Sequence, residues 1–316
     1  ELISPEINDD LRFLIRKLHI GGIILFKRNL EGPDQIRRLC DDAQDYATAS
    51  GLSPLFIAID QEGGCVSRLP QPYSQFDGNS AMESEEDASL FADVTGKELY
   101  DAGFNMNMAP VLDVAHADCD SIMAERAFGA DPEWVARLGN RVIEGLQRQR
   151  IMAVAKHFPG IGRTVLDSHV DLPSLSTDYE SLMARDLPPF QKAIEHRVDG
   201  MMLSHIIYEG IDPQWPASLS RRITADLLRS KFHFGGLVLT DDLDMGAIAD
   251  HFDIRTVIQR VMIADIDIAL ICHSMEKMEV AHEQMMQSAV DSKSLAHATD
   301  RSYERIMGLK DKYLMR

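Results

Sequence analysis

The sequence predicts an α/β fold of the TIM type, a (β/α)8 barrel in which one strand is lacking or degenerate. Three observations predict it. Seven short apolar runs recur along the chain, amphipathic segments separate them, and polar residues follow most of the runs. The runs span residues 22–26, 55–60, 106–113, 152–158, 200–205, 236–242 and 266–272.

The seven runs read as strands because most of them are continuously apolar and short. Strands of this kind are buried on both faces, which is typical of a parallel sheet covered by helices. A barrel needs eight strands. The eighth either precedes Glu1 or is a weak segment near the carboxyl end, and the sequence does not choose between them.

The segment 131–149 illustrates the intervening helices. Asp131 can cap a helix, and Pro132 suits the first helical position. Apolar side chains then repeat every four residues, at Trp134, Leu138, Val142 and Leu146. This pattern predicts an amphipathic helix that packs on the sheet.

Polar side chains gather where the runs end, and this predicts the place of the site. They are Lys27, Arg28, Asp60 to Glu62, Asp113, Lys156, His157, His205, Asp241 and Asp242. In a (β/α)8 barrel, the loops after the carboxyl ends of the strands build the active site. A doubly wound sheet is disfavoured because no G-x-G-x-x-G follows the first strand.

Composition limits the domain count and the partners. The chain has 316 residues, 45% of them hydrophobic, and no linker-like segment, so one barrel domain over residues 1–316 is expected. A formal net charge of −18 disfavours nucleic acid and anionic membranes as partners and favours a small neutral substrate. Four scattered cysteines and the lack of a transmembrane-length run or signal peptide indicate a cytoplasmic protein, and we expect a monomer without cofactor.

The stretch from Lys156 to His169 carries the most specific chemistry. It joins an apolar run to a glycine-rich loop that bears Asp167 and His169. An Asp two residues before a His can fix the imidazole tautomer, which leaves the other ring nitrogen free to move protons near neutrality. Gly160 and Gly162 suggest that this loop is mobile.

Several motifs in this order resemble family 3 glycoside hydrolases of the single-domain β-N-acetylhexosaminidase type, which trim N-acetylglucosamine from cell-wall fragments in peptidoglycan recycling. The motifs lie at residues 21–29 (GGIILFKRN), 59–64 (IDQEGG) with Arg68, 108–113 (MAPVLD), 126–132, 156–169 and 239–245 (LTDDLDM). The likeness therefore runs nearly from end to end.

The resemblance implies a retaining mechanism and assigns roles to eight residues. Asp241 is implied as the nucleophile, and His169, tuned by Asp167, as the general acid and base. The residues implied to bind the hydroxyl groups of the terminal sugar are Asp60, Arg68, Arg126, Lys156 and His157. The residues alone leave Asp242 open as a rival nucleophile, because adjacent strand residues point to opposite faces.

Two departures from the family pattern leave alternatives open. Ile161 stands where the family usually has His, and Cys65 where it usually has Arg. A catalytically impaired sugar-binding relative is therefore one alternative. An N-acetylglucosaminide phosphorylase is another, for a different reason: a histidine acid/base repels an anionic phosphate acceptor less than a carboxylate would.

Two further alternatives come from the residues themselves. One is a metal-dependent hydrolase with ligands Asp60, His157, His169, His205 and Asp241, although no H-x-H pair supports it. The other is a Schiff base on Lys156.

Overall fold

The computed structural model describes residues 4–115, 120–164, 168 and 171–315. One parallel sheet organises it, with the strand order β1-β2-β3-β4-β6-β8-β9. These strands are β1 (Gly22–Leu25), β2 (Phe56–Ile59), β3 (Met106–Asn107), β4 (Met152–Phe158), β6 (Gly200–Leu203), β8 (Leu237–Asp242) and β9 (Ile268–Leu270). All seven predicted strands are confirmed.

The sheet forms a TIM-like barrel that is one strand short. Within the described part of the chain, no pairing joins the two edge strands β1 and β9. An apolar cavity of about 320 Å³ lies along this seam, lined by residues of both edges such as Ile23 and Ile268. The expected barrel with one strand lacking is therefore observed.

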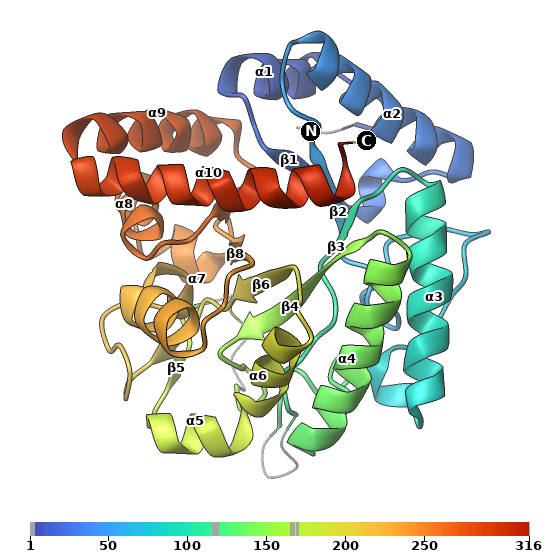
Figure 1. The fold of residues 1–316 in the computed structure, drawn as a ribbon, viewed down its shortest axis with the longest axis vertical. Coiled ribbons are helices and arrows are strands. Elements are labelled where there is room, and N and C mark those ends of the chain that lie inside the picture. The colour runs from blue at the N-terminus through green and yellow to red at the C-terminus, as the bar shows by residue number, and fades with distance from the viewer. Residues whose placement is uncertain (1–3, 116–119, 165–167, 169–170, 316) are drawn as a thin grey trace.

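The helices cover the outside of the sheet and one end of it (Figure 1). They are α1 (Asp9–Leu18), α2 (Pro33–Ala49), α3 (Glu85–Asp101), α4 (Pro132–Arg148), α5 (Tyr179–Arg185), α6 (Pro188–Glu195), α7 (Gly246–Ala249), α8 (Ile254–Ile263), α9 (Met275–Asp291) and α10 (Lys293–Tyr313). A π-helical segment spans Arg222–Lys231. None of the helices in the described ranges is long and apolar enough to cross a membrane.

Helix α4 forms as the sequence predicts. Its N-cap is Asp131, whose side chain accepts a hydrogen bond from the Glu133 N–H, and Pro132 occupies the first helical position. The buried face includes Leu138, Val142 and Leu146. The amphipathic pattern therefore identified both the helix and the face that it buries.

Strand β3 is much shorter than the run that predicts it. Regular pairing stops after Asn107, and beyond it the segment contacts β4 through a bridge of Val111 with Lys156 and a few irregular backbone hydrogen bonds, such as the one from the Leu112 N–H to the Lys156 carbonyl. Pro110 has no N–H to donate and so interrupts the ladder. A second, two-stranded parallel sheet of β5 (Ser174–Leu175) and β7 (Ile207–Tyr208) was not predicted.

Helix α10 lies against the amino ends of the strands. Its Tyr313 hydroxyl donates to Asp199, which precedes β6, and its Arg305 donates to Asp267, which precedes β9. Figure 1 shows α10 running across this end of the sheet. The functional site therefore has to be sought at the opposite end, where the strands have their carboxyl ends.

Candidate active site

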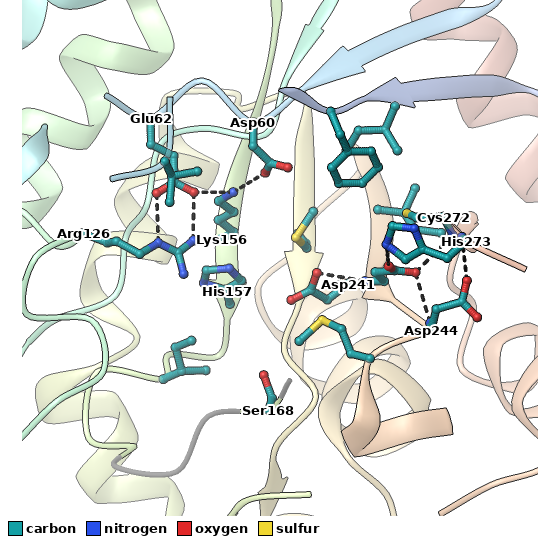
Figure 2. A pocket seen from close by; sticks show the side chains of 18 of the residues that line it. Asp60, Glu62, Arg126, Lys156, His157, Ser168, Asp241, Asp244, Cys272 and His273 are labelled. Carbon is teal, nitrogen blue, oxygen red and sulfur yellow. Dashed lines mark hydrogen bonds and ion pairs between the residues drawn. The ribbon is translucent and has the colours of Figure 1, made fainter. Parts of the chain in front are cut away.

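A cavity of about 380 Å³ lies at the carboxyl ends of the strands (Figure 2). It is lined by six of the eight residues that the sequence predicts: Asp60, Arg68, Arg126, Lys156, His157 and Asp241. Figure 2 shows the charged cluster of Asp60, Glu62, Arg126 and Lys156 on one side and His273 on the other, with Asp241 between them. The strand ends therefore converge as the barrel prediction requires.

The other two predicted residues, Asp167 and His169, lie outside the described residues. Ser168, which stands between them in the sequence, lines the same cavity as Asp241. Its carbonyl oxygen accepts a hydrogen bond of 3.1 Å from the Ala247 N–H, just after the Asp241 strand.

Lys156 and Arg126 are held by carboxylates in the loop that follows β2. Lys156 Nζ lies 2.7 Å from an Asp60 oxygen and 2.6 Å from a Glu62 oxygen. Arg126 donates to both oxygens of Glu62, at 2.8 and 3.0 Å. Burial alone would raise the pKa of Glu62, but Lys156 and Arg126 lower it to about 2. The cluster is therefore a fixed set of charged groups.

The same contacts disfavour a Schiff base on Lys156. Burial would lower the pKa of Lys156, but Asp60 and Glu62 outweigh it and raise the pKa. A Schiff base needs a neutral amine, which requires a lowered pKa. Lys156 instead keeps its proton and can donate hydrogen bonds.

Arg68 is presented to the cavity by an ordered loop. The side-chain oxygen of Gln61 accepts hydrogen bonds from the Arg68 N–H at 2.8 Å and the Leu69 N–H at 3.1 Å. The buried Nε of Arg68 has no hydrogen-bond partner among the described residues. A donor left unpaired at a cavity wall is costly, and a polar ligand would satisfy it.

His157 is oriented by Asp113, a residue to which the sequence analysis assigned no role. His157 Nδ1 lies 2.7 Å from Asp113 Oδ2, and the Asp113 side chain is fully buried. A carboxylate that accepts from Nδ1 leaves Nε2 as the second, available ring nitrogen. Asp113 is the last residue of a predicted strand, and this position was the signal that could have identified it.

The adjacent carboxylates of Asp241 and Asp242 have different surroundings. Asp242 Oδ1 accepts hydrogen bonds from the N–H groups of Asp244 and Cys272, at 3.0 and 3.2 Å. Burial raises the pKa of Asp242. The carboxylate of Asp241, in contrast, receives one hydrogen bond from the described residues, 2.8 Å from the Asp242 N–H.

The pKa of Asp241 moves in the opposite direction. Burial alone would raise it, but His205 and His157, together with the hydrogen bond from the Asp242 N–H and the charge of Lys156, outweigh burial and lower the pKa. The Asp241 carboxylate is therefore ionised at neutral pH, and it has lone pairs that accept no hydrogen bond from the described residues.

The two glycines that suggest a mobile loop have a packing reason in the structure. A Cβ on residue 162 would lie 1.8 Å from the Val114 carbonyl oxygen. Gly160 has a φ of +122°, and a Cβ there would lie 2.8 Å from the Cβ of Asp186. Both positions therefore require glycine for close packing.

The two departures from the family pattern differ in their positions. Ile161 lines the cavity and donates its N–H to Asp113 at 2.8 Å. Cys65 is exposed and is not among the residues that line the cavity. Only Ile161 is therefore placed to affect a bound ligand directly.

The metal-hydrolase alternative gains no support from the geometry. Both ring nitrogens of His205 are engaged, by Ser218 and by the Asp242 carbonyl. In the described ranges, no group of three or more His, Cys, Asp or Glu side chains could hold a metal ion. His273, a residue that the sequence analysis did not single out, lines the cavity, and its Nδ1 lies 3.2 Å from the Arg28 guanidinium.

The fold and the site define a barrel enzyme with a charged, hydrogen-bonding cavity at the carboxyl ends of its strands. A model of the glycosyl hydrolase family 3 N terminal domain matches residues 1–309. The chain therefore belongs to glycosyl hydrolase family 3, and it is a glycoside hydrolase.

Similar proteins agree with this assignment. The chain is 34% identical over 275 residues to a β-hexosaminidase of Pseudomonas aeruginosa, a match that covers 85% of this chain and 80% of the relative. A family 3 β-N-acetylglucosaminidase from a Paenibacillus species has a similar structure, with a TM-score of 0.94 and 35% identity over 99% of this chain and 60% of that one. A β-N-acetylhexosaminidase from Beutenbergia cavernae has a TM-score of 0.88 and 27% identity over 98% and 94% of the two chains.

Proposed function

We propose that the chain is a retaining β-N-acetylglucosaminidase that removes terminal N-acetylglucosamine from cell-wall fragments. Asp241 acts as the nucleophile, and His169, tuned by Asp167, acts as the general acid and then the general base. The observation that carries the proposal is the ionised Asp241 carboxylate, which faces a cavity walled by fixed charged donors and holds only one hydrogen bond from the described residues.

The cavity suits one sugar unit at a chain end. Its volume of about 380 Å³ is near the lower end of the range for small-molecule sites. Lys156, Arg68 and Arg126 supply donors, and the carboxylate of Asp60 supplies acceptors. A sugar presents both donors and acceptors in its hydroxyl groups, so this wall can bind several hydroxyls and reject analogues that lack them.

The reaction proceeds in two steps in this proposal. A carboxylate oxygen of Asp241 attacks the anomeric carbon, the glycosidic bond breaks, and the His169 imidazolium gives its proton to the leaving oxygen. The neutral imidazole then takes a proton from water, which attacks the anomeric carbon and releases Asp241. Two displacements retain the β configuration.

The names of the relatives support the choice of an N-acetylated hexosamine. Proteins similar to this chain over most of its length are β-hexosaminidases and β-N-acetylglucosaminidases. The proposal further places the enzyme in the cytoplasm as a monomer with residues 1–316 as one barrel domain. Three free cysteines among the described residues fit a reducing compartment.

The test is the hydrolysis of a chromogenic N-acetylglucosaminide compared with the matched glucoside. We expect kcat/KM to be at least ~10²-fold higher for the N-acetylated substrate than for the glucoside. A site that hydrogen-bonds the acetamido group discriminates strongly against a substrate that lacks this group. Tight binding of N-acetylglucosamine without turnover would instead identify a sugar-binding relative. Sugar phosphate formed in the presence of inorganic phosphate would identify a phosphorylase.

A further inference from the structure

His205 is a buried histidine next to the proposed nucleophile that the mechanism does not use. It follows β6, and it is 1% exposed. It is not among the residues that line the cavity, so it has no direct access to a sugar bound there. Its contacts nevertheless reach the end of β8, where Asp241 stands.

The two ring nitrogens of His205 have different partners. Nε2 lies 2.9 Å from the carbonyl oxygen of Asp242, and Nδ1 lies 2.7 Å from the hydroxyl oxygen of Ser218. A carbonyl oxygen only accepts, so Nε2 carries the proton. Nδ1 of the neutral ring then accepts from the Ser218 hydroxyl, which is fully buried. Ser218 therefore favours the tautomer that Asp242 needs.

The state of charge agrees with these roles. Burial lowers the pKa of His205, and this effect outweighs the attraction of the Asp241 carboxylate, which raises the pKa. The imidazole is therefore neutral at neutral pH. Because the His205 ring is neutral, it does not form a permanent ion pair with the Asp241 carboxylate.

On its β6 side, the end of β8 has no regular ladder beyond Thr240, whereas on its β9 side Asp242 is still paired with Leu270. Pairing of β6 with β8 ends at Leu203 and Thr240, and the pairing of β8 with β9 shifts register between Leu239 and Asp242. The hydrogen bond from His205 to the Asp242 carbonyl replaces the missing ladder bond on the β6 side. The N–H of the same residue, Asp242, donates to the Asp241 carboxylate.

We propose that His205 is a positioning residue that, through the Asp242 backbone, aims the Asp241 carboxylate at the anomeric carbon, with Ser218 selecting its tautomer. This inference rests on the proposed role of Asp241 as nucleophile. A small misplacement of a reacting group of about 1 Å can cost ~10²-fold in rate. The role therefore concerns the chemical step and not the binding of the sugar.

Two substitutions separate this role from a merely structural one. In His205→Gln the side-chain amide nitrogen can reach the position of Nε2 and donate to the Asp242 carbonyl. In His205→Asn the shorter amide keeps the contact with Ser218 but does not reach Asp242. His205→Gln thus keeps the hydrogen bond to Asp242, and His205→Asn keeps the one to Ser218. Both variants place a polar amide at the position of the imidazole.

We expect His205→Asn to lower kcat for an aryl N-acetylglucosaminide by ~10²-fold, and His205→Gln to lower it by less than ~10-fold. The dissociation constant of N-acetylglucosamine should stay within ~3-fold of wild type in both variants. Equal losses of kcat in the two variants, an unchanged kcat in His205→Asn, or a parallel loss of sugar binding would overturn the positioning role.

Two further measurements keep the outcome decisive. If His205→Asn does not fold, Ser218→Ala tests the same chain of contacts, with an expected loss of ~3- to 10-fold in kcat and unchanged sugar binding; an unchanged kcat would overturn the role. The wild-type enzyme separates the two proposals: an inactive wild type, or a covalent intermediate on another residue, refutes the proposed function itself.

Discussion

Both ends of the barrel hold a carboxylate close to the strands, but the two carboxylates accept different numbers of hydrogen bonds. At the amino ends, the fully buried side chain of Asp267 accepts four hydrogen bonds, from Arg229, Arg305, the Ser302 hydroxyl and the Val238 N–H. At the carboxyl ends, the Asp241 carboxylate accepts one hydrogen bond from the described residues, and it faces a cavity.

This difference separates a structural charge from a reactive one. A carboxylate that is saturated with donors has no lone pair left for a substrate, and removing it leaves buried cations unpaired. A carboxylate with free lone pairs next to a cavity can attack or bind. The comparison therefore predicts losses of activity at one end and losses of stability at the other.

The largest expected effect is that of Asp241→Ala. Loss of the nucleophile should lower kcat by at least ~10³-fold, because no covalent glycosyl-enzyme can form. Steady-state hydrolysis of a chromogenic N-acetylglucosaminide measures it, with circular dichroism to confirm folding. A variant that keeps more than a tenth of the activity would exclude Asp241 from the chemistry.

His169→Ala should lower turnover by ~10²- to 10⁴-fold. The loss should be least for aryl glycosides whose leaving group needs no proton, because the general acid is then dispensable in the first step. A series of leaving groups of different pKa measures this dependence. The same loss across the whole series would reject His169 as proton donor.

Asp267→Asn should have the opposite profile to Asp241→Ala. We expect it to lower the free energy of unfolding by about 3 kcal/mol, because the amide leaves Arg229 and Arg305 incompletely paired. Activity of the folded enzyme should stay within ~2-fold of wild type. Urea denaturation measures the stability, and Asp9→Asn, at an exposed aspartate in the first turn of α1, is the matched control. A lower kcat with an unchanged free energy of unfolding would contradict the structural role of Asp267.

Glu62 should make stability depend on pH in the acid range. Its pKa falls from 4.5 in the unfolded chain to about 2 in the folded protein. The unfolded chain therefore takes up the proton first as the pH falls, so the contribution is complete above pH 4.5 and lost as the pH approaches about 2. We expect a loss of about 3 kcal/mol from this group, measured by urea titrations at stepped pH. Glu62→Gln should flatten the dependence, and an unchanged slope would contradict the pairing.

The smallest expected effect is a gain in stability at Lys310. This side chain on α10 is 2% exposed, lies near Ser53 and the Phe56 ring, and has no carboxylate partner among the described residues. Burial lowers the pKa of Lys310 to about 8 from 10.5. The buried cation therefore costs stability below pH 8, and the cost fades as the pH rises toward 10.5.

Lys310→Met should consequently raise the free energy of unfolding by about 2 kcal/mol at pH 7 and by less at pH 10. Thermal unfolding at the two pH values measures the difference. A destabilised variant at pH 7 would show that the Ser53 and Phe56 contacts outweigh the cost of burying the charge.

The sequence predicted the framework of the fold because burial on both faces leaves a direct signature in each strand. The seven strands and the helix that Asp131 caps follow from local patterns, whereas the place of an eighth strand does not. The end of the β3 run was overestimated, because Pro110 interrupts pairing within an otherwise apolar segment. The small β5–β7 sheet escaped prediction because strands of two residues carry no periodicity.

The site was predictable as a set of positions but not as a set of contacts. Polar residues at the strand ends marked Asp60, Lys156 and Asp241, which do line one cavity. The pairing of Glu62 with Arg126, the support of His157 by Asp113, and the bond from His205 to Asp242 join segments that are distant in sequence. Such contacts depend on the order and register of neighbouring strands, which no local pattern specifies.

The measurement that tests the central claim most directly is covalent labelling with a fluorinated N-acetylglucosaminide that carries a good leaving group. Such a compound slows the second step, so the glycosyl-enzyme accumulates, and mass spectrometry of peptides locates the sugar. The account predicts one sugar per chain on Asp241 and none in Asp241→Ala. A label on Asp242, or full turnover without any covalent adduct, would contradict it.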